Sequence, residues 1–127
     1  MATFSQVPIM TIQQPFGNFF DFTVSYTIRY TEEELAFPEG FVETLFFREN
    51  DDQEPFGGDD DTYGVVQPVF FRPQSRMETR TFKFSRTAAA LDTESGGEEV
   101  YATVGHRRNI DGLNFNFRNT GIFPLAV

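Results

Sequence analysis

The clearest pattern in the sequence is an alternation of apolar and polar side chains between residues 20 and 31. Every even position of this segment is large and apolar, and every odd position is polar. Side chains repeat every two residues along a β-strand, so the segment predicts a strand with one face in a core and the other in water. At about 3.3 Å per residue this strand would be about 40 Å long, and we expect it to bend or to pass from one neighbouring strand to another.

The same alternation recurs less regularly elsewhere, between turns rich in Gly, Pro, Asn and Asp. Asn109 to Gly112 has the composition of a tight hairpin turn, and only residues 31–37 and 87–91 look locally helical. No alternation of strands with long helices exists, so we expect antiparallel pairing. The further predicted strands are residues 4–13, 41–49, 63–72, 77–87, 99–107 and 113–118, with another at 121–127 if that segment pairs.

The sequence therefore predicts an all-β fold, an antiparallel β-sandwich of seven to eight strands in one domain that covers residues 1–127. A mass of 14.6 kDa fits one domain with one core. A closed barrel fits less well, because the count of strands is odd and the turns lack an up-and-down rhythm.

The segment from Leu91 to Val104 resembles the loop and strand that form the tyrosine corner of immunoglobulin-like and fibronectin type III-like β-sandwiches. Tyr101 stands in the position of the corner tyrosine. The resemblance implies an immunoglobulin-like sandwich in which the Tyr101 hydroxyl bonds back to a backbone group a few residues upstream. Antibody domains also contain a cysteine pair and a buried tryptophan, and this chain has neither Cys nor Trp.

The composition excludes several kinds of chemistry. Without cysteine the chain has no disulfide, no thiol nucleophile and no Cys-ligated zinc or iron–sulfur site. The single histidine, His106, excludes a multi-histidine metal centre, and no serine lies in a G-x-S-x-G elbow. We therefore expect neither catalysis nor a resident cofactor, and only a pocket that gathers His106 with two carboxylates would favour an enzyme.

Charge is distributed unevenly along the chain. The formal net charge is −9, and the segment from Glu32 to Asp61 contributes −11 through twelve acidic residues and one arginine. An acidic protein is repelled by phosphate backbones, so we expect no nucleic-acid partner. The sequence shows no signal peptide and no apolar run long enough to span a membrane, so we expect no membrane insertion and leave the location of the protein open.

The densest acidic cluster lies between residues 49 and 61, on both sides of a Gly-Gly pair. Ca²⁺ prefers several oxygen ligands, and a loop of this kind could wrap one ion, although the spacing of the acids does not match an EF-hand. We expect a solvated loop, and an ordered calcium site is the alternative. The aspartates that would ligate calcium are Asp51, Asp52, Asp59, Asp60 and Asp61.

Basic residues gather on and beside the strand predicted at 77–87. They are Arg76, Arg80, Lys83 and Arg86. Phe82 and Phe84 are expected to face the core and Lys83 the solvent. The arginines then pair with acids on neighbouring strands such as Glu99, or they attract the acidic segment of a second copy of the chain.

Phenylalanine is frequent, with 17 residues in the chain, and it occurs in doublets such as Phe46-Phe47 and Phe70-Phe71. Neighbours on a strand face opposite sides, so one ring of each doublet points away from the core. Those rings fill edge and loop interfaces, or they form an exposed apolar patch of the kind that marks a partner surface.

These observations favour a protein that binds rather than catalyses. We expect a non-catalytic structural or interaction subunit, a repeated component of a larger assembly such as a viral particle or a surface appendage. Its partners would be proteins, including further copies of itself. The alternative is a calcium-assisted carbohydrate- or ligand-binding module that uses the loops around residues 50–62 and Tyr63.

Overall fold

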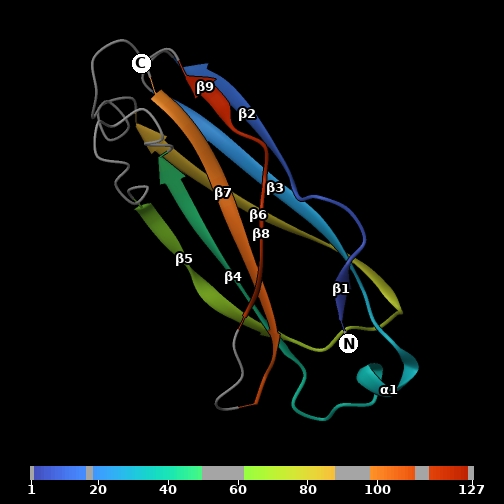
Figure 1. The fold of residues 1–127 in the computed structure, drawn as a ribbon. Coiled ribbons are helices and arrows are strands. Elements are labelled where there is room, and N and C mark those ends of the chain that lie inside the picture. Colours follow the sequence, from blue (N-terminus) through green and yellow to red (C-terminus); the bar gives the residue numbers. More distant parts are fainter. Residues whose placement is uncertain (1, 17–18, 50–61, 88–97, 111–114, 126–127) are drawn as a thin grey trace, which may run out of the picture.

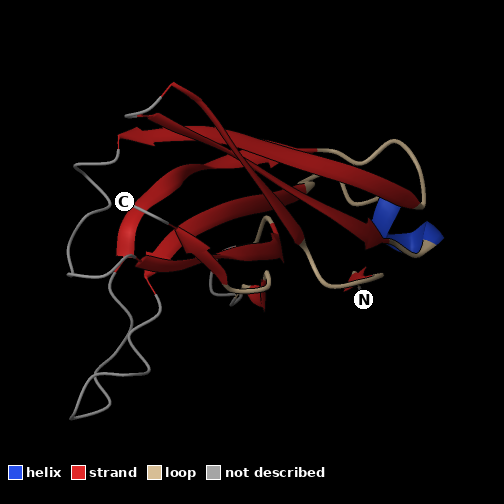
Figure 2. Cartoon of the chain, turned by 90° about the horizontal axis from the view of Figure 1, so that it is seen from above, coloured by secondary structure: helices blue, strands red, loops and turns tan. Residues whose placement is uncertain are grey.

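The protein is an antiparallel sandwich of two sheets. The computed structural model describes residues 2–16, 19–49, 62–87, 98–110 and 115–125. Figure 1 shows sheet B in front of sheet A, and Figure 2 shows the two layers from above. Sheet A consists of β1 (Thr3–Phe4), β2 (Ile9–Phe16), β3 (Phe19–Arg29) and β6 (Met77–Thr87). Sheet B consists of β4 (Phe41–Glu49), β5 (Thr62–Phe71), β7 (Glu98–Arg108), β8 (Asn116–Asn119) and β9 (Phe123–Leu125). The predicted all-β, two-layer architecture is confirmed.

The central strand of sheet A is β3. It pairs with β6 over its whole length, from Phe19 opposite Thr87 to Arg29 opposite Met77. Along its other side β3 pairs with β2 and then, at its end, with β1, so the long strand passes from one neighbour to another as predicted. The strand predicted at residues 4–13 is divided in two, and Pro8, which cannot donate a ladder hydrogen bond, lies in the break.

Sheet B is built on β4 and β7. Its strand order is β5-β4-β7, and β8 and β9 pair with two different stretches of β7. The antiparallel pairing of β7 with β8 is the arrangement that the predicted hairpin turn requires, although residues 111–114 lie outside the described part of the chain.

Both sheets contribute to the core. On β3 the even-numbered side chains are buried, as the alternation predicts. The two layers meet in contacts such as that between Phe22 of sheet A and Phe47 of sheet B, whose ring centroids lie 4.6 Å apart. Burial of one such side chain contributes about 1.5–3 kcal/mol to stability.

One short helix, α1 (Glu32–Leu35), links β3 to β4, where a helical segment was predicted. The Thr31 hydroxyl accepts a hydrogen bond from the Glu34 amide at 3.2 Å, and the Glu34 carboxylate accepts one from the Thr31 amide at 2.9 Å. This capping box fixes the start of the helix. Gly40, with φ of +68°, makes the turn into β4, where a Cβ atom would lie 2.5 Å from the Phe71 carbonyl oxygen. The helix predicted at 87–91 falls almost wholly outside the described residues.

Candidate functional site

A network of polar side chains crosses the core between the sheets. Its members are Tyr26 of β3, Tyr30 just after it, Glu43 of β4, Arg80 of β6 and His106 of β7. Four of them are only 1–3% exposed, and the Arg80 side chain is 28% exposed. Polar groups this deeply buried require partners, so their hydrogen bonds decide what the network can do.

Glu43 and Arg80 form the charged centre of the network. Nη2 and Nε of Arg80 donate to Oε1 of Glu43 at 2.7 and 3.1 Å, and Nε also lies 3.2 Å from Oε2. Tyr26 donates its hydroxyl hydrogen to the same carboxylate. Cζ of Arg80 lies 3.9 Å from the centroid of the Phe71 ring. The hydrogen bonds with Glu43 raise the pKa of Arg80 above its usual value, and together the contacts offset the cost of burying the carboxylate.

The hydrogen bonds assign the tautomer of His106. Because Tyr26 donates its only hydroxyl hydrogen to Glu43, the 3.2 Å contact between this hydroxyl and Nδ1 requires His106 to donate from Nδ1. Nε2 is then the acceptor, and the Tyr30 hydroxyl donates to it at 3.0 Å. Burial, followed by the charge of Arg80, lowers the pKa of His106 to about 4. Burial, followed by the charge of Glu43, raises the pKa of both tyrosines, so the imidazole and both phenols are neutral at pH 7.

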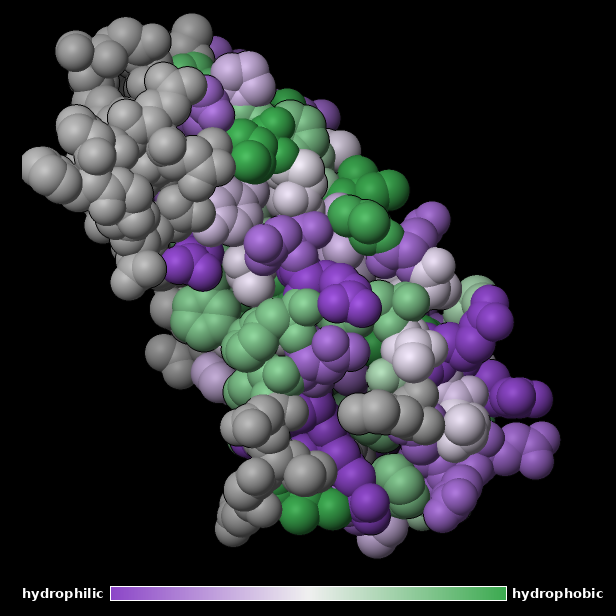
Figure 3. All heavy atoms as spheres, in the orientation of Figure 1, coloured by the Kyte–Doolittle hydropathy of each residue, from purple (hydrophilic) through white to green (hydrophobic). Residues whose placement is uncertain are grey.

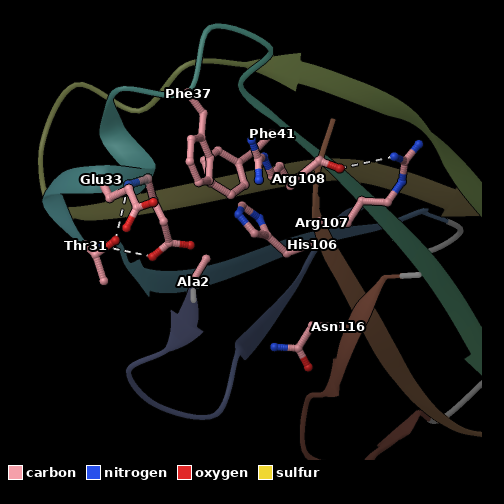
Figure 4. A pocket seen from close by; sticks show the side chains of 10 residues that line it. Ala2, Thr31, Glu33, Phe37, Phe41, His106, Arg107, Arg108 and Asn116 are labelled. Atoms are coloured by element: carbon pink, nitrogen blue, oxygen red, sulfur yellow. Dashed lines mark hydrogen bonds between the residues drawn. The ribbon is translucent and has the colours of Figure 1, made fainter. Parts of the chain in front are cut away.

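A pocket of about 400 Å³ opens beside this network, between α1, the start of β4 and the end of β7 (Figure 4). Phe37, Phe41 and the His106 imidazole line its apolar part. The Phe37 and Phe41 ring centroids lie 6.2 Å apart, and Phe41 stacks on His106 at 5.3 Å. A volume of this size accepts a small organic molecule. The polar lining residues are Thr31, Glu33, Glu34, Arg107, Arg108 and Asn116.

Two of the charged lining residues are already engaged by their neighbours. Glu34 holds the capping box with Thr31. Arg108 donates to Glu39, and its Cζ lies 3.5 Å from the centroid of the Phe37 ring. Glu34 and Arg108 therefore form part of the pocket wall, and only other polar lining residues are available to bind a ligand.

Two polar lining residues, Glu33 and Asn116, keep side-chain hydrogen-bonding groups for a ligand. The guanidinium of Arg107 is turned away from the pocket (Figure 4), because Nη1 donates to the carbonyl oxygens of Arg108 and Ile110 at 3.2 Å each and Cζ lies 4.9 Å from the centroid of the Phe115 ring. The side chains of Glu33 and Asn116 have no ion pair or hydrogen bond with any described residue. The pocket therefore contains a carboxylate and an amide that can bind a ligand.

The pocket brings His106 together with two carboxylates, Glu33 and Glu34, which is the combination that would favour an enzyme. However, both imidazole nitrogens are bound to tyrosine hydroxyls, and Glu34 is committed to the helix cap. Neither nitrogen is free to exchange a proton with a ligand, so the arrangement suits binding better than acid–base chemistry.

The outer face of sheet B is aromatic. Val42 and Thr44 of β4 point outward and yet are buried. The ring of Phe117 lies over Gly105, where a Cβ atom would stand 2.7 Å from it, and its centroid lies 6.0 Å from that of Phe46. Figure 3 shows hydrophobic spheres gathered over the middle of this side. We call this surface the outer aromatic face, and its rings are Phe46, Phe70, Phe115 and Phe117.

The outer face of sheet A bears hydroxyl groups instead. Ser25 lies 3.2 Å from Thr81 and Thr27 lies 3.1 Å from Thr79, hydroxyl oxygen to hydroxyl oxygen. These pairs connect β3 to β6 and keep the middle of this surface polar, while Ile9, Phe19 and Met77 are exposed at the ends of its strands. The two outer faces of the sandwich therefore differ in kind.

The basic residues of β6 are placed only partly as expected. Phe82 faces the core and Lys83 faces solvent, as predicted. Arg80 shares the side of Phe82, but it pairs with Glu43 across the sandwich and not with an acid on a neighbouring strand. The expected partner of Arg80 was therefore wrong, because an inward arginine meets the opposite sheet before it can reach its own.

The residues proposed for calcium lie outside the described part of the chain. They are Asp51, Asp52, Asp59, Asp60 and Asp61. Among the described residues, no three His, Asp or Glu side chains gather so that they could hold a metal ion. The calcium alternative stays a prediction.

Tyr101 lies on the outer side of β7, where it is buried and where Cζ of Arg48 lies 5.9 Å from the centroid of its ring. Residues 91–97 lie outside the described part, so the tyrosine corner also stays a prediction.

Sequence reasoning missed the roles of Glu43 and of Tyr26. A signal for Glu43 was present, because Phe41, Glu43 and Leu45 share one side of a strand, and a carboxylate among apolar neighbours requires a partner.

No helix among the described residues has the length and apolar character needed to cross a membrane. A fold shared by many proteins does not define a function, so function has to be argued from the pocket and the two outer faces. Comparison with models of protein families and with curated proteins finds no match to this chain.

Proposed function

We propose that this protein is a non-catalytic interaction subunit that pairs with a second copy of itself through the outer aromatic face. The pair would serve as a repeated unit of a larger assembly, such as a viral particle or a surface appendage. One observation carries the proposal: rings gather on the outer face of sheet B, with Phe70 65% and Phe117 45% exposed, whereas the middle of the outer face of sheet A bears paired hydroxyls. The exposed apolar side chains of sheet A, Ile9, Phe19 and Met77, lie at the ends of strands. Contiguous exposed apolar patches mark interaction sites, and aromatic residues are enriched in interface cores.

The outer aromatic face belongs to a five-stranded sheet, and a sheet face favours a second copy as the partner. A two-fold axis brings the same patch of two chains together, and two sheets pack face to face about 10 Å apart. Although the chain has a net charge of −9, the guanidinium groups of Arg48 and Arg107 lie against rings on this side, over Tyr101 and Phe115. Among the described residues, these two arginines bring positive charge to the face and offset part of the acidic charge that would oppose pairing.

The strand order supports an immunoglobulin-like interaction domain. If β2, β3, β4, β5, β6, β7 and β8 take the positions A, B, C, C′, E, F and G, sheet A has the order A-B-E and sheet B the order C′-C-F-G. Immunoglobulin-like sandwiches divide their strands in this way. Tyr101 then lies on strand F, the strand of the corner tyrosine.

Size-exclusion chromatography with light scattering, across protein and salt concentration, tests the pairing. We expect a species of twice 14.6 kDa at high protein concentration. Association should strengthen with salt, because salt screens the repulsion between two acidic chains and leaves apolar contacts intact. A head-to-tail contact between the acidic segment and the arginines would weaken with salt.

Substitutions locate the interface. Phe70→Ser and Phe117→Ser should shift the equilibrium to single chains. Met77→Ser is the matched control, because Met77 is 49% exposed but lies on sheet A. A single-chain mass at every protein and salt concentration would contradict the proposal.

A further inference from the structure

We propose that the free edge of β6 binds an extended acidic segment of a partner protein, which adds to sheet A as a further antiparallel strand. The inference goes beyond the proposed pairing, because it concerns the side of sheet A and not the outer aromatic face of sheet B. It rests on the unpaired backbone of β6, on the regularity of this strand and on its basic side chains.

Within the described part of the chain, β6 is paired along one side only. Its neighbour is β3, and the Tyr30 amide donates to the Arg76 carbonyl oxygen at 2.7 Å where the two strands begin to pair. Bonded and non-bonded pairs alternate along an antiparallel ladder. The even-numbered residues of β6 therefore bond to β3, and the odd-numbered residues direct their N–H and C=O groups away from it.

The outward backbone groups are free in the middle of this edge. Near one end the Ser75 hydroxyl donates to the Met77 carbonyl oxygen at 2.7 Å. Near the other end Arg86 donates to the Ser85 carbonyl oxygen at 2.8 Å. The residues between them whose outward N–H and C=O groups bond to no described residue are Thr79, Thr81 and Lys83. A row of free backbone groups of this kind is a template for another strand.

The other two long edge strands are less suited to this role. β2 contains Pro15, and its register with β3 shifts between Gln13 and Phe16. β5 contains Pro68, and its register with β4 shifts as well. Proline and bulges protect an edge from pairing with another chain. β6 has neither Pro nor Gly, and it pairs with β3 along all 11 of its residues without a shift.

Charge selects the kind of strand that can be added. The basic residues on and beside β6 that form no ion pair with a described residue are Arg76, Lys83 and Arg86. The nearby acids are already engaged, since Glu78 accepts from two backbone amides of the preceding turn and Asp21 accepts from the Ser85 hydroxyl at 2.6 Å. Like charges on adjacent strands repel, so the edge disfavours a second copy of β6 and favours an acidic segment.

The two faces of β6 indicate the pattern of the added strand. Side chains opposite Thr79, Thr81 and Lys83 would share their exposed outer face, so an acid there meets the Lys83 ammonium group. Side chains at the intervening positions would lie beside Phe84, which is half-buried and whose ring centroid lies 5.0 Å from that of Phe47. An apolar side chain gains burial there. The best partner is therefore a segment in which acidic and apolar residues alternate.

Fluorescence anisotropy of the full chain with a labelled peptide tests this inference. The probe has nine residues, is blocked at both ends and alternates glutamate with valine. We expect it to bind, and a peptide with lysine in place of glutamate should bind at least about tenfold more weakly. Binding should weaken as salt is added, because the attraction is between exposed charges.

Methylation of the peptide backbone separates strand addition from attraction between charges alone. With glutamate on the outer face, the glutamate amides point toward β6 and the valine amides point away from it. N-methylation of the glutamates should therefore weaken binding at least about tenfold. N-methylation of the valines is the matched control and should leave binding close to that of the parent peptide.

A charge variant locates the peptide on β6. Lys83→Glu should weaken the glutamate–valine peptide by about fivefold, because it replaces attraction with repulsion on the outer face. Arg118→Glu is the matched control, because it reverses an exposed charge of the same sign on β8 of sheet B.

A backbone variant tests the edge itself. Thr81→Pro removes an N–H group that points away from β3, so it should weaken the peptide while a thermal melt shows a folded chain. Thr81→Val keeps the N–H group and should bind the peptide as the parent does.

Two results would overturn the proposal. One is equal binding of the two N-methylated peptides, which would mean that charge alone holds the peptide. The other is an unchanged anisotropy with the unmethylated acidic peptide up to millimolar protein. Pairing through the outer aromatic face is measured by mass and strengthens with salt, so either inference can fail while the other holds.

Discussion

His106 is a buried titratable side chain, and its burial makes stability depend on pH. Its pKa of about 4 in the folded protein lies below the usual 6.5, so the unfolded chain binds a proton first as the pH falls. Above pH 6.5, His106 is neutral in both states and its burial does not reduce the free energy of unfolding. As the pH falls from 6.5 to 4, the unfolded chain gains a proton that the folded chain does not, and the free energy of unfolding decreases by about 3 kcal/mol. Urea denaturation at pH 7.5 and at pH 5 measures the loss.

The variant His106→Gln isolates this effect from the titration of carboxylates. It should be less stable than the parent at pH 7.5, and its stability should change less between pH 7.5 and 5. An equal pH dependence in both proteins would show that His106 is not the group responsible.

Arg80 compensates the buried carboxylate of Glu43, so its removal should be costly. Arg80→Leu leaves Glu43 charged and short of partners, and we expect a loss of about 3–5 kcal/mol in urea denaturation. Arg86→Leu is the matched control, because Arg86 lies on the same strand, donates to its neighbouring Ser85 carbonyl and should matter little.

The double variant Arg80→Leu with Glu43→Leu should recover much of that loss, since no uncompensated charge is left in the core. If the single variant Arg80→Leu and the double variant were equally stable, Arg80 would not be compensating the buried charge of Glu43.

Alternation along a strand was enough to predict β3, because every even side chain from Phe20 to Ile28 is apolar and buried. It was not enough to predict the break near Pro8, because the pairing of β1 and β2 depends on where β3 offers free backbone groups.

Contacts between the sheets could be predicted only in part. The sequence contains a signal for both residues, because Glu43 lies on an apolar side of its strand and Arg80 shares a side with Phe82, but the signal for Glu43 was not used. Their meeting depends on how the two sheets stack, and a period of two within each strand does not encode that offset. The pocket depends on the turn at Gly40, which places α1 beside the end of β7. The alternation of side chains within single strands does not predict this turn.

The contact between Phe117 and Gly105 attaches the edge strand β8 to β7. A methyl group at position 105 would stand 2.7 Å from the Phe117 ring, so Gly105→Ala should push the ring aside and cost about 1 kcal/mol. Gly121→Ala is the control, because no atom lies within 4 Å of the position that its Cβ would take. Thermal unfolding of both variants measures the difference, and equal transition temperatures would contradict the contact.

The two outer faces together determine how far self-association can proceed. With one apolar face a chain can form a closed pair, whereas a chain with apolar surfaces on both sides can add copies without limit. The paired hydroxyls of Thr79 with Thr27 and of Thr81 with Ser25 keep the middle of sheet A polar and so limit growth at that side. The hydroxyl groups on the outer face of sheet A, which we call the hydroxyl face, are therefore as important for an assembly of defined size as the outer aromatic face.

Replacing the hydroxyl face should therefore change the size of the assembly and not only its strength. Thr79→Val with Thr81→Val keeps the shape and the strand propensity of β6 but gives sheet A an apolar outer surface. Light scattering should then show species larger than twice 14.6 kDa that grow with protein concentration. Adding Phe70→Ser should return the distribution to closed pairs, now formed through sheet A, because each chain again has one apolar face. If the double valine variant kept the mass of the parent at every concentration, apolar character of the sheet faces would not be what drives the chains together.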